Sequence, residues 1–216
     1  MIKSVAVLGL GSYGKSLAVN LYEMGADVLV ADRNEELIRD FSSRVTAAVC
    51  ADLAVEDEVK QLGLQNTDVV ITAMGQDLAP SIMCAAIAKE SGVPLVVSKP
   101  SSDLMASLLK RVGTDKVINP EVESGLRSAR VLMSSSFFDF FQIDDSISMV
   151  EISPWPDWAD RSVRQLNLRK KHNINLVAIK KPDGTWKPVR PDDVLHSDER
   201  ILIIAERSAL EAINRH

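Results

Sequence analysis

The chain has 216 residues, 46% hydrophobic and 25% charged, which leaves room for a domain of average size and a second, small one. Its formal net charge of −5 and the lack of a long Lys/Arg stripe argue against nucleic acid as a partner. No apolar run approaches the ~20 residues of a membrane span and no signal segment is recognisable, so we expect a cytoplasmic protein.

The first predicted strand, Ile2–Leu8, runs straight into Gly9-Leu10-Gly11-Ser12-Tyr13-Gly14. In such a loop the first glycine allows a tight turn, the second lets the backbone approach a pyrophosphate, and the third brings helix against strand. The following helix offers N–H groups and partial positive charge to phosphates. The next strand, Val28–Ala31, ends in Asp32, which can accept both ribose hydroxyls and would repel a 2′-phosphate. NAD, ATP, ADP or AMP therefore fits better than NADP.

Strand-like and helix-like segments alternate up to residue 120. Asn34 and Ser102 (or Ser101) are predicted N-caps, and Pro80 fits the first turn of an Ala-rich helix that ends near Ser91-Gly92. The pattern predicts an α/β fold, a Rossmann-like doubly wound parallel sheet of strand order 3-2-1-4-5-6, with its ligand crevice at the carboxyl ends of strands 1 and 4. The six predicted strands are Ile2–Leu8, Val28–Ala31, Ala47–Cys50, Val69–Ala73, Leu95–Val97 and Lys116–Ile118.

The two cysteines, Cys50 and Cys84, each lie in an apolar stretch. We expect both to be buried free thiols in a reducing compartment, with no disulfide or metal role.

Residues 121–143 are predicted to form a linking helix, which we read from Glu121 to Gln142. Four of the chain's five phenylalanines crowd into Phe137–Phe141, too many for one face of a small core. The helix would pack either against another subunit or onto the chain's own second domain, and the sequence leaves both open.

Residues 144–216 are predicted to form a small α+β domain. Its elements are a βαββ-like series, Ile147–Ile152, Ser162–Leu166, Ile174–Ile179, Lys187–Val189 and Arg200–Ala205, with a Pro182-Asp183-Gly184 turn and a short terminal helix. So small a domain would gain stability from dimerisation.

Recognisable catalytic machinery is missing. The three histidines, His172, His196 and His216, lie outside the first 120 residues, and none of the GxSxG, HExxH or Walker GK[ST] motifs occurs. Lys99, directly after the fifth strand, could approach a ligand. We therefore expect a sensor that binds its nucleotide without transforming it. Two alternatives stay open: a small NAD-dependent oxidoreductase that uses Lys99 or a histidine of the second domain, and a Rossmann protein that serves only as a dimerisation scaffold.

The layout of Gly9–Gly14, Asp32, Ala51-Asp52, Ala73-Met74-Gly75 and Asn119-Pro120-Glu121, with the small second domain, resembles the regulator of potassium conductance (RCK) family. Within it the chain is similar to the cytosolic subunits of Ktr/Trk-type potassium uptake systems. The resemblance implies a non-enzymatic homodimer that assembles into an octameric ring under a membrane potassium-translocating subunit. ATP or ADP, or NAD(H) in some members, would change the shape of the ring.

The resemblance also implies roles for single residues. Ser12 stands where Ktr-type members commonly carry an arginine that reaches the terminal phosphate, and Lys15 is the candidate to replace it. Phosphates would lie against the glycine loop, the ribose against Asp32 and the base near Arg33. The full set implied for the nucleotide is Gly9, Gly11, Ser12, Tyr13, Gly14, Asp32, Arg33, Asp52, Leu53, Thr72, Ala73, Met74, Gly75 and Lys99.

Two further sites are implied by the same resemblance. Glu121 matches an acidic position that binds Mg²⁺ or Ca²⁺ in some relatives. Arg169, Ile174, Asn175 and Pro191 match residues that bind cyclic di-AMP in others, and arginine suits a phosphate ligand because its planar fork grips two oxygens. A basic solvated turn is the alternative for this second set.

Overall fold

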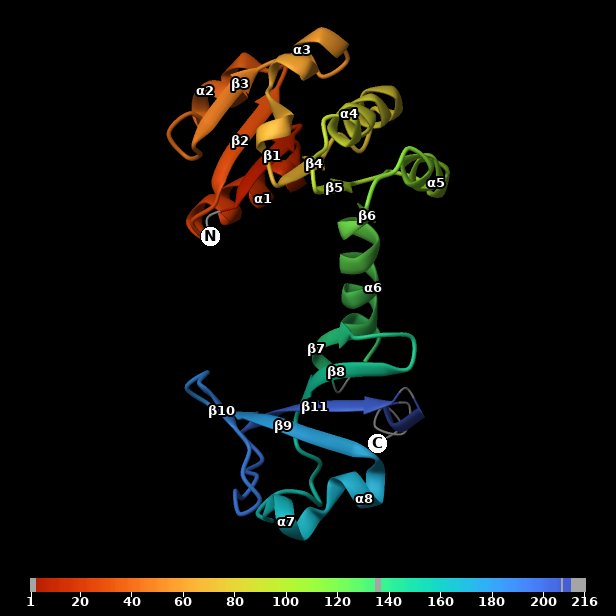
Figure 1. The fold of residues 1–216 in the computed structure, drawn as a ribbon. Helices are drawn as coiled ribbons and strands as arrows, with labels where there is room; N and C mark the ends of the chain where they lie inside the picture. The colour runs from red at the N-terminus through yellow and green to blue at the C-terminus, as the bar shows by residue number, and fades with distance from the viewer. Residues whose placement is uncertain (1–2, 135–136, 207, 211–216) are drawn as a thin grey trace. The chain divides into compact units, whose positions relative to one another are not determined.

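The computed structural model of the protein describes residues 3–134, 137–206 and 208–210 (Figure 1). The chain divides into two compact units, Met1–Pro120 and Glu121–His216, each with its own core.

The first unit is built on a parallel sheet. Among the described residues it has six strands in the order β3-β2-β1-β4-β5-β6, as the sequence predicts. This order puts the ends of β1 and β4 side by side at the carboxyl edge, where the chain turns in opposite directions. The strands are β1 (Ser4–Leu8), β2 (Asp27–Asp32), β3 (Ala47–Cys50), β4 (Val69–Thr72), β5 (Leu95–Ser98) and β6 (Lys116–Val117).

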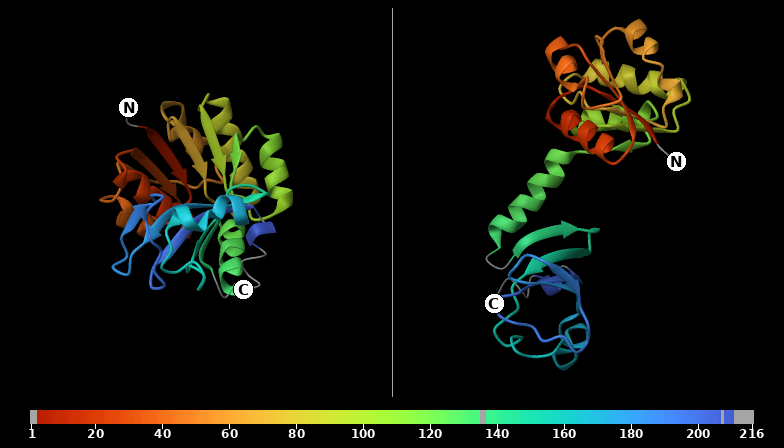
Figure 2. Two further views of the ribbon diagram at one scale, coloured as in Figure 1. Left: turned by 90° about the horizontal axis from the view of Figure 1, so that it is seen from below. Right: turned by 90° about the vertical axis from the view of Figure 1, so that its left-hand side faces the viewer.

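Helices cover both faces of this sheet (Figure 2). One face packs against α1 and α2 through a core that includes Val7, Val30 and Phe41. The other packs against α3, α4 and α5 through a core that includes Leu8 and Leu109. The helices are α1 (Ser12–Glu23), α2 (Glu35–Phe41), α3 (Glu56–Gln61), α4 (Leu78–Glu90) and α5 (Asp103–Arg111), with a 3₁₀ turn at Leu64–Asn66.

The predicted helix caps are confirmed. The Asn34 side chain accepts hydrogen bonds from the backbone N–H groups of Glu36 and Leu37, and the Ser102 hydroxyl accepts one from Met105. Short polar side chains at these positions satisfy N–H groups that have no partner inside the helix. These caps determine where α2 and α5 leave the carboxyl edge of the sheet.

The expectation of two buried thiols is half wrong. Cys84 on α4 is buried, and this burial raises the pKa of its thiol to about 12. Cys50 is exposed, since β3 is the edge strand and has only one neighbour, β2. Both are free cysteines.

The second unit combines α6 with an antiparallel sheet. The described strands are arranged in the order β10-β9-β11-β8-β7. The elements are α6 (Pro120–Met133), β7 (Phe137–Gln142), β8 (Ile147–Ile152), α7 (Val163–Leu166), α8 (Leu168–His172), β9 (Ile174–Lys180), β10 (Trp186–Pro188) and β11 (Arg200–Glu206). The predicted short terminal helix falls largely outside the described residues.

The prediction of one helix from Glu121 to Gln142 is wrong in its second half. The helix α6 ends at Met133, and the phenylalanine-rich segment is strand β7, paired with β8. Aromatic side chains fit a pleated sheet, and partner strands outweigh the local helical pattern.

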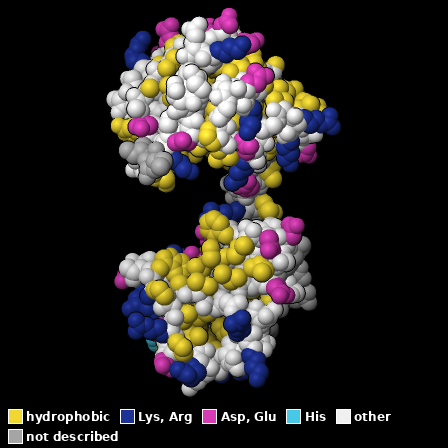
Figure 3. Space-filling view, viewed as in Figure 1, with side chains coloured by type: hydrophobic (Ala, Val, Ile, Leu, Met, Phe, Trp, Pro, Cys, Tyr) yellow, Lys and Arg dark blue, Asp and Glu magenta, His cyan; other side chains and the backbone are white. Residues whose placement is uncertain are grey.

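Strand geometry also separates the phenylalanines. Phe137 and Phe140 are buried in the core, whereas Phe138 and Phe141 are 44% and 46% exposed. A register shift between Phe137 and Asp139 produces this division. Apolar side chains gather on one face of the second unit in Figure 3, and the exposed ones near β7 include Ile143 as well.

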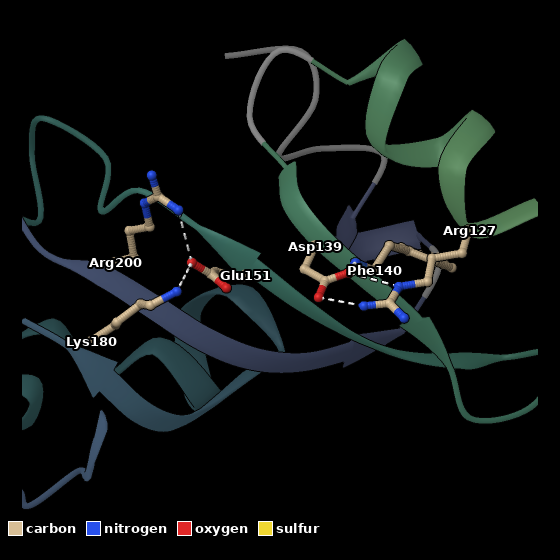
Figure 4. A network of polar contacts seen from close by, with 6 residues as sticks. All are labelled: Arg127, Asp139, Phe140, Glu151, Lys180 and Arg200. Atoms are coloured by element: carbon tan, nitrogen blue, oxygen red, sulfur yellow. Dashed lines mark hydrogen bonds and ion pairs between the residues drawn. The ribbon is translucent and has the colours of Figure 1, made fainter. Parts of the chain in front are cut away.

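Ion pairs fasten α6 and the strands of the second unit together (Figure 4). Arg127 on α6 donates two hydrogen bonds to the Asp139 carboxylate on β7, at 2.8 and 2.6 Å, and its guanidinium lies 4.0 Å from the Phe141 ring centre. The buried carboxylate of Glu151 on β8 accepts from Lys180 and Arg200, on β9 and β11, at 3.2 Å each. The start of the second unit is therefore tied to its sheet by charge as well as by packing.

Among the described helices, none combines the length and the apolar character that a membrane span requires.

We predict that Asp139→Asn lowers the free energy of unfolding by about 1 kcal/mol, because a half-exposed ion pair contributes modestly. The Arg127 guanidinium, followed by the Phe140 N–H, holds the pKa of the Asp139 carboxyl below its ordinary value. The contribution is therefore complete above the unfolded pKa of about 3.9 and is lost as the pH falls through the lower folded pKa.

Denaturant unfolding from neutral pH down to about pH 3 checks this prediction. The difference between wild type and Asp139→Asn should shrink on acidification, while Asp145→Asn, at an exposed carboxylate of the same unit, should make little difference at neutral pH. A difference that stays constant over this range would contradict the role given to the pair.

Candidate nucleotide site

The glycine loop between β1 and α1 is shaped by its lack of side chains. Gly9 has φ +98°, and its N–H donates to the Ala31 carbonyl at 2.8 Å. A β-carbon built on Gly14 would lie 2.0 Å from the Gly9 carbonyl oxygen, so helix α1 can approach the loop only with glycine there. A β-carbon built on Gly11 would meet no atom within 4 Å. The middle glycine therefore leaves space open above the helix N-terminus.

Asp32, at the end of β2, accepts a hydrogen bond from the backbone of this loop. One carboxylate oxygen accepts the Leu10 N–H at 2.7 Å and the other accepts the Asn34 N–H at 3.0 Å. Each carboxylate oxygen has a second lone pair, so both can still accept a ribose hydroxyl. The same side chain thus orients the loop and presents the acceptors of a ribose clamp.

A cavity of about 210 Å³ opens beside Asp32 at the carboxyl edge of the sheet. Five of its lining residues were predicted from the sequence: Asp32, Arg33, Asp52, Leu53 and Met74. Sequence reasoning missed three others, Ala54, Asp77 and Pro80. Their signal was position, because Ala54 follows β3 and the other two open α4, directly after strands that end at this edge.

The segment after β4 borders the glycine loop. A β-carbon built on Gly9 would lie 3.3 Å from the Met74 nitrogen, and one on Gly14 would lie 3.3 Å from the Ala73 methyl group. Thr72 is fully buried, and its hydroxyl donates a hydrogen bond to the Ser98 hydroxyl on β5 at 2.8 Å. This bond joins the carboxyl ends of β4 and β5 beneath the crevice. A β-carbon built on Gly75 would lie 3.0 Å from the Nζ atom of Lys99.

The remaining predicted nucleotide residues lie at the start of α1. Ser12 is its first residue and is exposed, and Tyr13 is half-buried. No acidic side chain stands in the first turn of this helix, so its partial positive charge is not offset there.

The candidate cyclic di-AMP residues of the second unit differ in their exposure to solvent. Arg169, Asn175 and Pro191 are exposed, whereas Ile174 is 1% exposed. A cavity of about 430 Å³ at the end of α8 includes Ile174 but none of the other three. It is lined by Trp155, Lys170, Lys171, His172, Asn173, Ile174, Ser208 and Ala209.

Glu121 is exposed in the first turn of α6. Within the described part of the chain, no group of three or more His, Cys, Asp or Glu side chains could hold a metal ion. His172 and His196 belong to the second unit, where His172 packs edge-on against Trp155 and His196 lies 3.4 Å from Asp160. His216 is outside the described residues.

The fold and this crevice define a two-domain protein whose first domain has the Rossmann-like fold of nucleotide-binding proteins. Residues 5–120 match the TrkA-N domain and residues 147–216 match the TrkA-C domain. The chain therefore belongs to the RCK family of proteins, in which a TrkA-N domain is followed by a TrkA-C domain, as its motifs indicate.

Several similar curated proteins are named potassium uptake proteins. The chain is 31% identical to Ktr system potassium uptake protein C of Bacillus subtilis over 204 residues, 94% of this chain and 92% of that one. It is 29% identical to Ktr system potassium uptake protein A of the same organism, over 97% and 94% of the two chains.

Solved structures agree on the fold. The GsuK RCK domain superimposes with a TM-score of 0.68 at 12% identity, over 100% of this chain and 47% of that one. The GsuK channel bound to NAD gives 0.67 at 12% identity, over 99% and 39%. The chain thus spans less than half of these structural neighbours.

The loop geometry predicts opposite outcomes for two alanine substitutions. Gly14→Ala places a methyl group against a backbone carbonyl and should cost more than about 2 kcal/mol of unfolding free energy. Gly11→Ala meets open space at φ −65° and should cost about 1 kcal/mol or less. Urea denaturation followed by circular dichroism measures both, and equal losses would refute the role given to Gly14.

Proposed function

We propose that the protein is a nucleotide-sensing regulatory subunit of a membrane potassium uptake system. The observation that carries this proposal is the open space over Gly11 beside the Asp32 carboxylate, in a chain whose relatives are named potassium uptake proteins. The subunit would act from the cytoplasmic face of the membrane, through a membrane potassium-translocating partner.

The ligand in this proposal is an adenine nucleotide, ATP or ADP, or NAD(H). Its ribose would bind Asp32, its base would enter the cavity beside Arg33 and Asp52, and its phosphates would lie over Gly11 at the start of α1. Support comes from the two unused lone pairs on Asp32 and from the lack of acidic residues in the first turn of α1. The GsuK channel, a structural neighbour, is described as bound to NAD.

Regulation requires that the ligand bind two states with different affinity, because equal binding shifts no equilibrium. We propose that these states are two arrangements of a homodimer within an octameric ring. The exposed Phe138 and Phe141 on β7 support a partner surface, since apolar side chains clustered on one face favour burial. A second copy of the chain would cover them.

Two further ligands remain part of this proposal. Glu121 would bind Mg²⁺ or Ca²⁺ together with the nucleotide. Cyclic di-AMP would bind Arg169, Ile174, Asn175 and Pro191, and the exposure of Arg169 and Asn175 is compatible with a phosphate ligand.

We predict that ATP, ADP or NAD(H) at ~100 times its dissociation constant adds about 2.7 kcal/mol to the stability of the folded protein. Thermal denaturation measures this gain. Gly11→Ala should fold and lose it, because the added methyl group occupies the space for the phosphates. Asp32→Ala should lose it as well, and Asp27→Ala, at the opposite end of the same strand, should keep it.

NADP(H) should stabilise the protein less than NAD(H), because Asp32 repels the 2′-phosphate. If none of these nucleotides raised the melting temperature of the wild-type protein, the sensor proposal would be lost. Consumption of NADH with small carbonyl substrates, abolished by Lys99→Ala, would favour the oxidoreductase alternative.

The regulatory role is tested by potassium uptake in cells that depend on the membrane partner. Uptake should require the wild-type chain and should lose its dependence on nucleotide with Gly11→Ala, at equal protein level. Asp27→Ala is the matched control. Uptake that proceeds equally without the chain would refute a regulatory role while leaving nucleotide binding intact.

A further inference from the structure

We propose that the second unit has a ligand site of its own, for a small carboxylic acid with a flat aromatic body. The site is the cavity of about 430 Å³ at the end of α8, which the proposed nucleotide function does not use. Protein sites for small molecules measure about 300 to 1,000 Å³, so this cavity has the size for an organic molecule rather than a single ion.

The chain forms this cavity where α8 turns into β9. Asn173 ends the helix in the left-handed region, at φ +56°, a conformation that asparagine tolerates better than most residues. Ile174, the first residue of β9, is buried directly after it. The remaining lining residues come from two other segments: Trp155 from the loop after β8, and Ser208 and Ala209 from the chain after β11.

The polar part of the lining is positively charged. Lys170 and Lys171 belong to the last turn of α8, and the described lining residues include no aspartate or glutamate. In the part of the chain that the structure describes, neither lysine forms an ion pair. An anion that enters therefore meets two ammonium groups without displacing an existing partner, and a charge-assisted hydrogen bond to an ammonium is among the strong ones. A cationic ligand would be repelled.

The apolar part of the lining includes an aromatic wall that is fixed from behind. The rings of Trp155 and Trp158 lie 4.4 Å apart, centre to centre, and Trp158 is 1% exposed in the core of the unit. His172 meets the Trp155 ring nearly at right angles, at 5.7 Å. An aromatic body can pack against this ring surface and against Ile174 and Ala209. Only the ring face or edge of Trp155 is required for this contact.

The cations that line the cavity favour a carboxylate over a phosphate as the acid group. The side chain that grips phosphate oxygens with a planar fork is arginine, and the described lining residues include none. Two lysines supply point charges, which match the single charge of a carboxylate beside an apolar body.

This cavity is separate from the residues proposed for cyclic di-AMP. Arg169 and Lys171 are two positions apart on α8 and therefore lie about 200° apart around the helix axis. Of the cyclic di-AMP set, only Ile174 is among the described lining residues. The basic run at the end of α8 is thus divided between two faces of the helix.

Calorimetric titration with 2-naphthoate tests the proposal. One molecule should bind per chain, with a dissociation constant between about 10 µM and 1 mM, as expected for a ligand of this size. Acetate lacks the ring and 2-naphthylmethylammonium carries the opposite charge. Each should bind at least about 10-fold more weakly than 2-naphthoate.

The double variant Lys170→Met/Lys171→Met should weaken 2-naphthoate roughly 10-fold or more, and it should fold normally because both side chains are exposed. Lys181→Met is the matched control, since it removes an exposed charge directly after β9 and should leave the affinity unchanged. Trp155→Leu should also weaken binding. If Trp155→Leu failed to fold, the lysine variants would decide.

Three results would overturn the proposal: wild-type protein that binds no 2-naphthoate, unchanged affinity in the double lysine variant, or acetate that binds as tightly as 2-naphthoate. Arg169→Met should leave the affinity for 2-naphthoate unchanged. If Arg169→Met abolished binding and cyclic di-AMP displaced 2-naphthoate, the cavity would be part of the cyclic di-AMP site, and a separate acid site would be refuted. Each of these results leaves nucleotide binding by the first unit as an independent question.

Discussion

The hydrogen bond from the Leu10 N–H to the Asp32 carboxylate, 2.7 Å long, is the interaction on which the first unit's site depends. It joins the ends of β1 and β2 at the point where the chain must turn into α1. The other carboxylate oxygen takes the Asn34 N–H, which brings the cap of α2 to the same place. One side chain thus orients the glycine loop and the start of α2, and it is the proposed acceptor for a ribose. A site arranged before the ligand arrives loses less free energy to ordering when it binds.

The glycines around this carboxylate have different tasks. Gly14 permits close packing of helix on loop, because its β-carbon would collide with the Gly9 carbonyl. Gly11 leaves an unfilled space. Gly75 admits the ammonium of a lysine from the neighbouring strand. A missing side chain therefore permits close packing at Gly14 and leaves room at Gly11 and Gly75, along one edge of the sheet.

The second unit depends on ion pairs between its elements as well as on its apolar core. Its core is a single cluster of buried side chains, and α6 is held to β7 by the bidentate Arg127–Asp139 pair. The carboxylate of Glu151, 8% exposed, is matched by two cations from neighbouring strands. A buried charge of this kind is tolerated only when it is paired, so these contacts specify how the strands align. Phe138 and Phe141 of β7 form an apolar surface that this unit covers only in part, through Arg200 and Arg127.

The amino-acid sequence by itself determined the strand order of the first unit, the caps Asn34 and Ser102, and the pairing of a glycine loop with Asp32. These features are local: each depends on residues close in the chain or on the alternation of strand and helix. The RCK family could also be predicted from the sequence motifs, and the TrkA-N and TrkA-C domain matches confirm it.

Only the tertiary structure decided the rest. Phe137–Gln142 became a strand because β8 offered it backbone partners, and Cys50 is exposed because β3 is an edge strand. The crevice brings Asp77, which precedes α4, together with Asp32, which ends β2, and Asp52, which follows β3. Such contacts arise between residues far apart in sequence, and their geometry exists only after the sheet has aligned the strands that carry them.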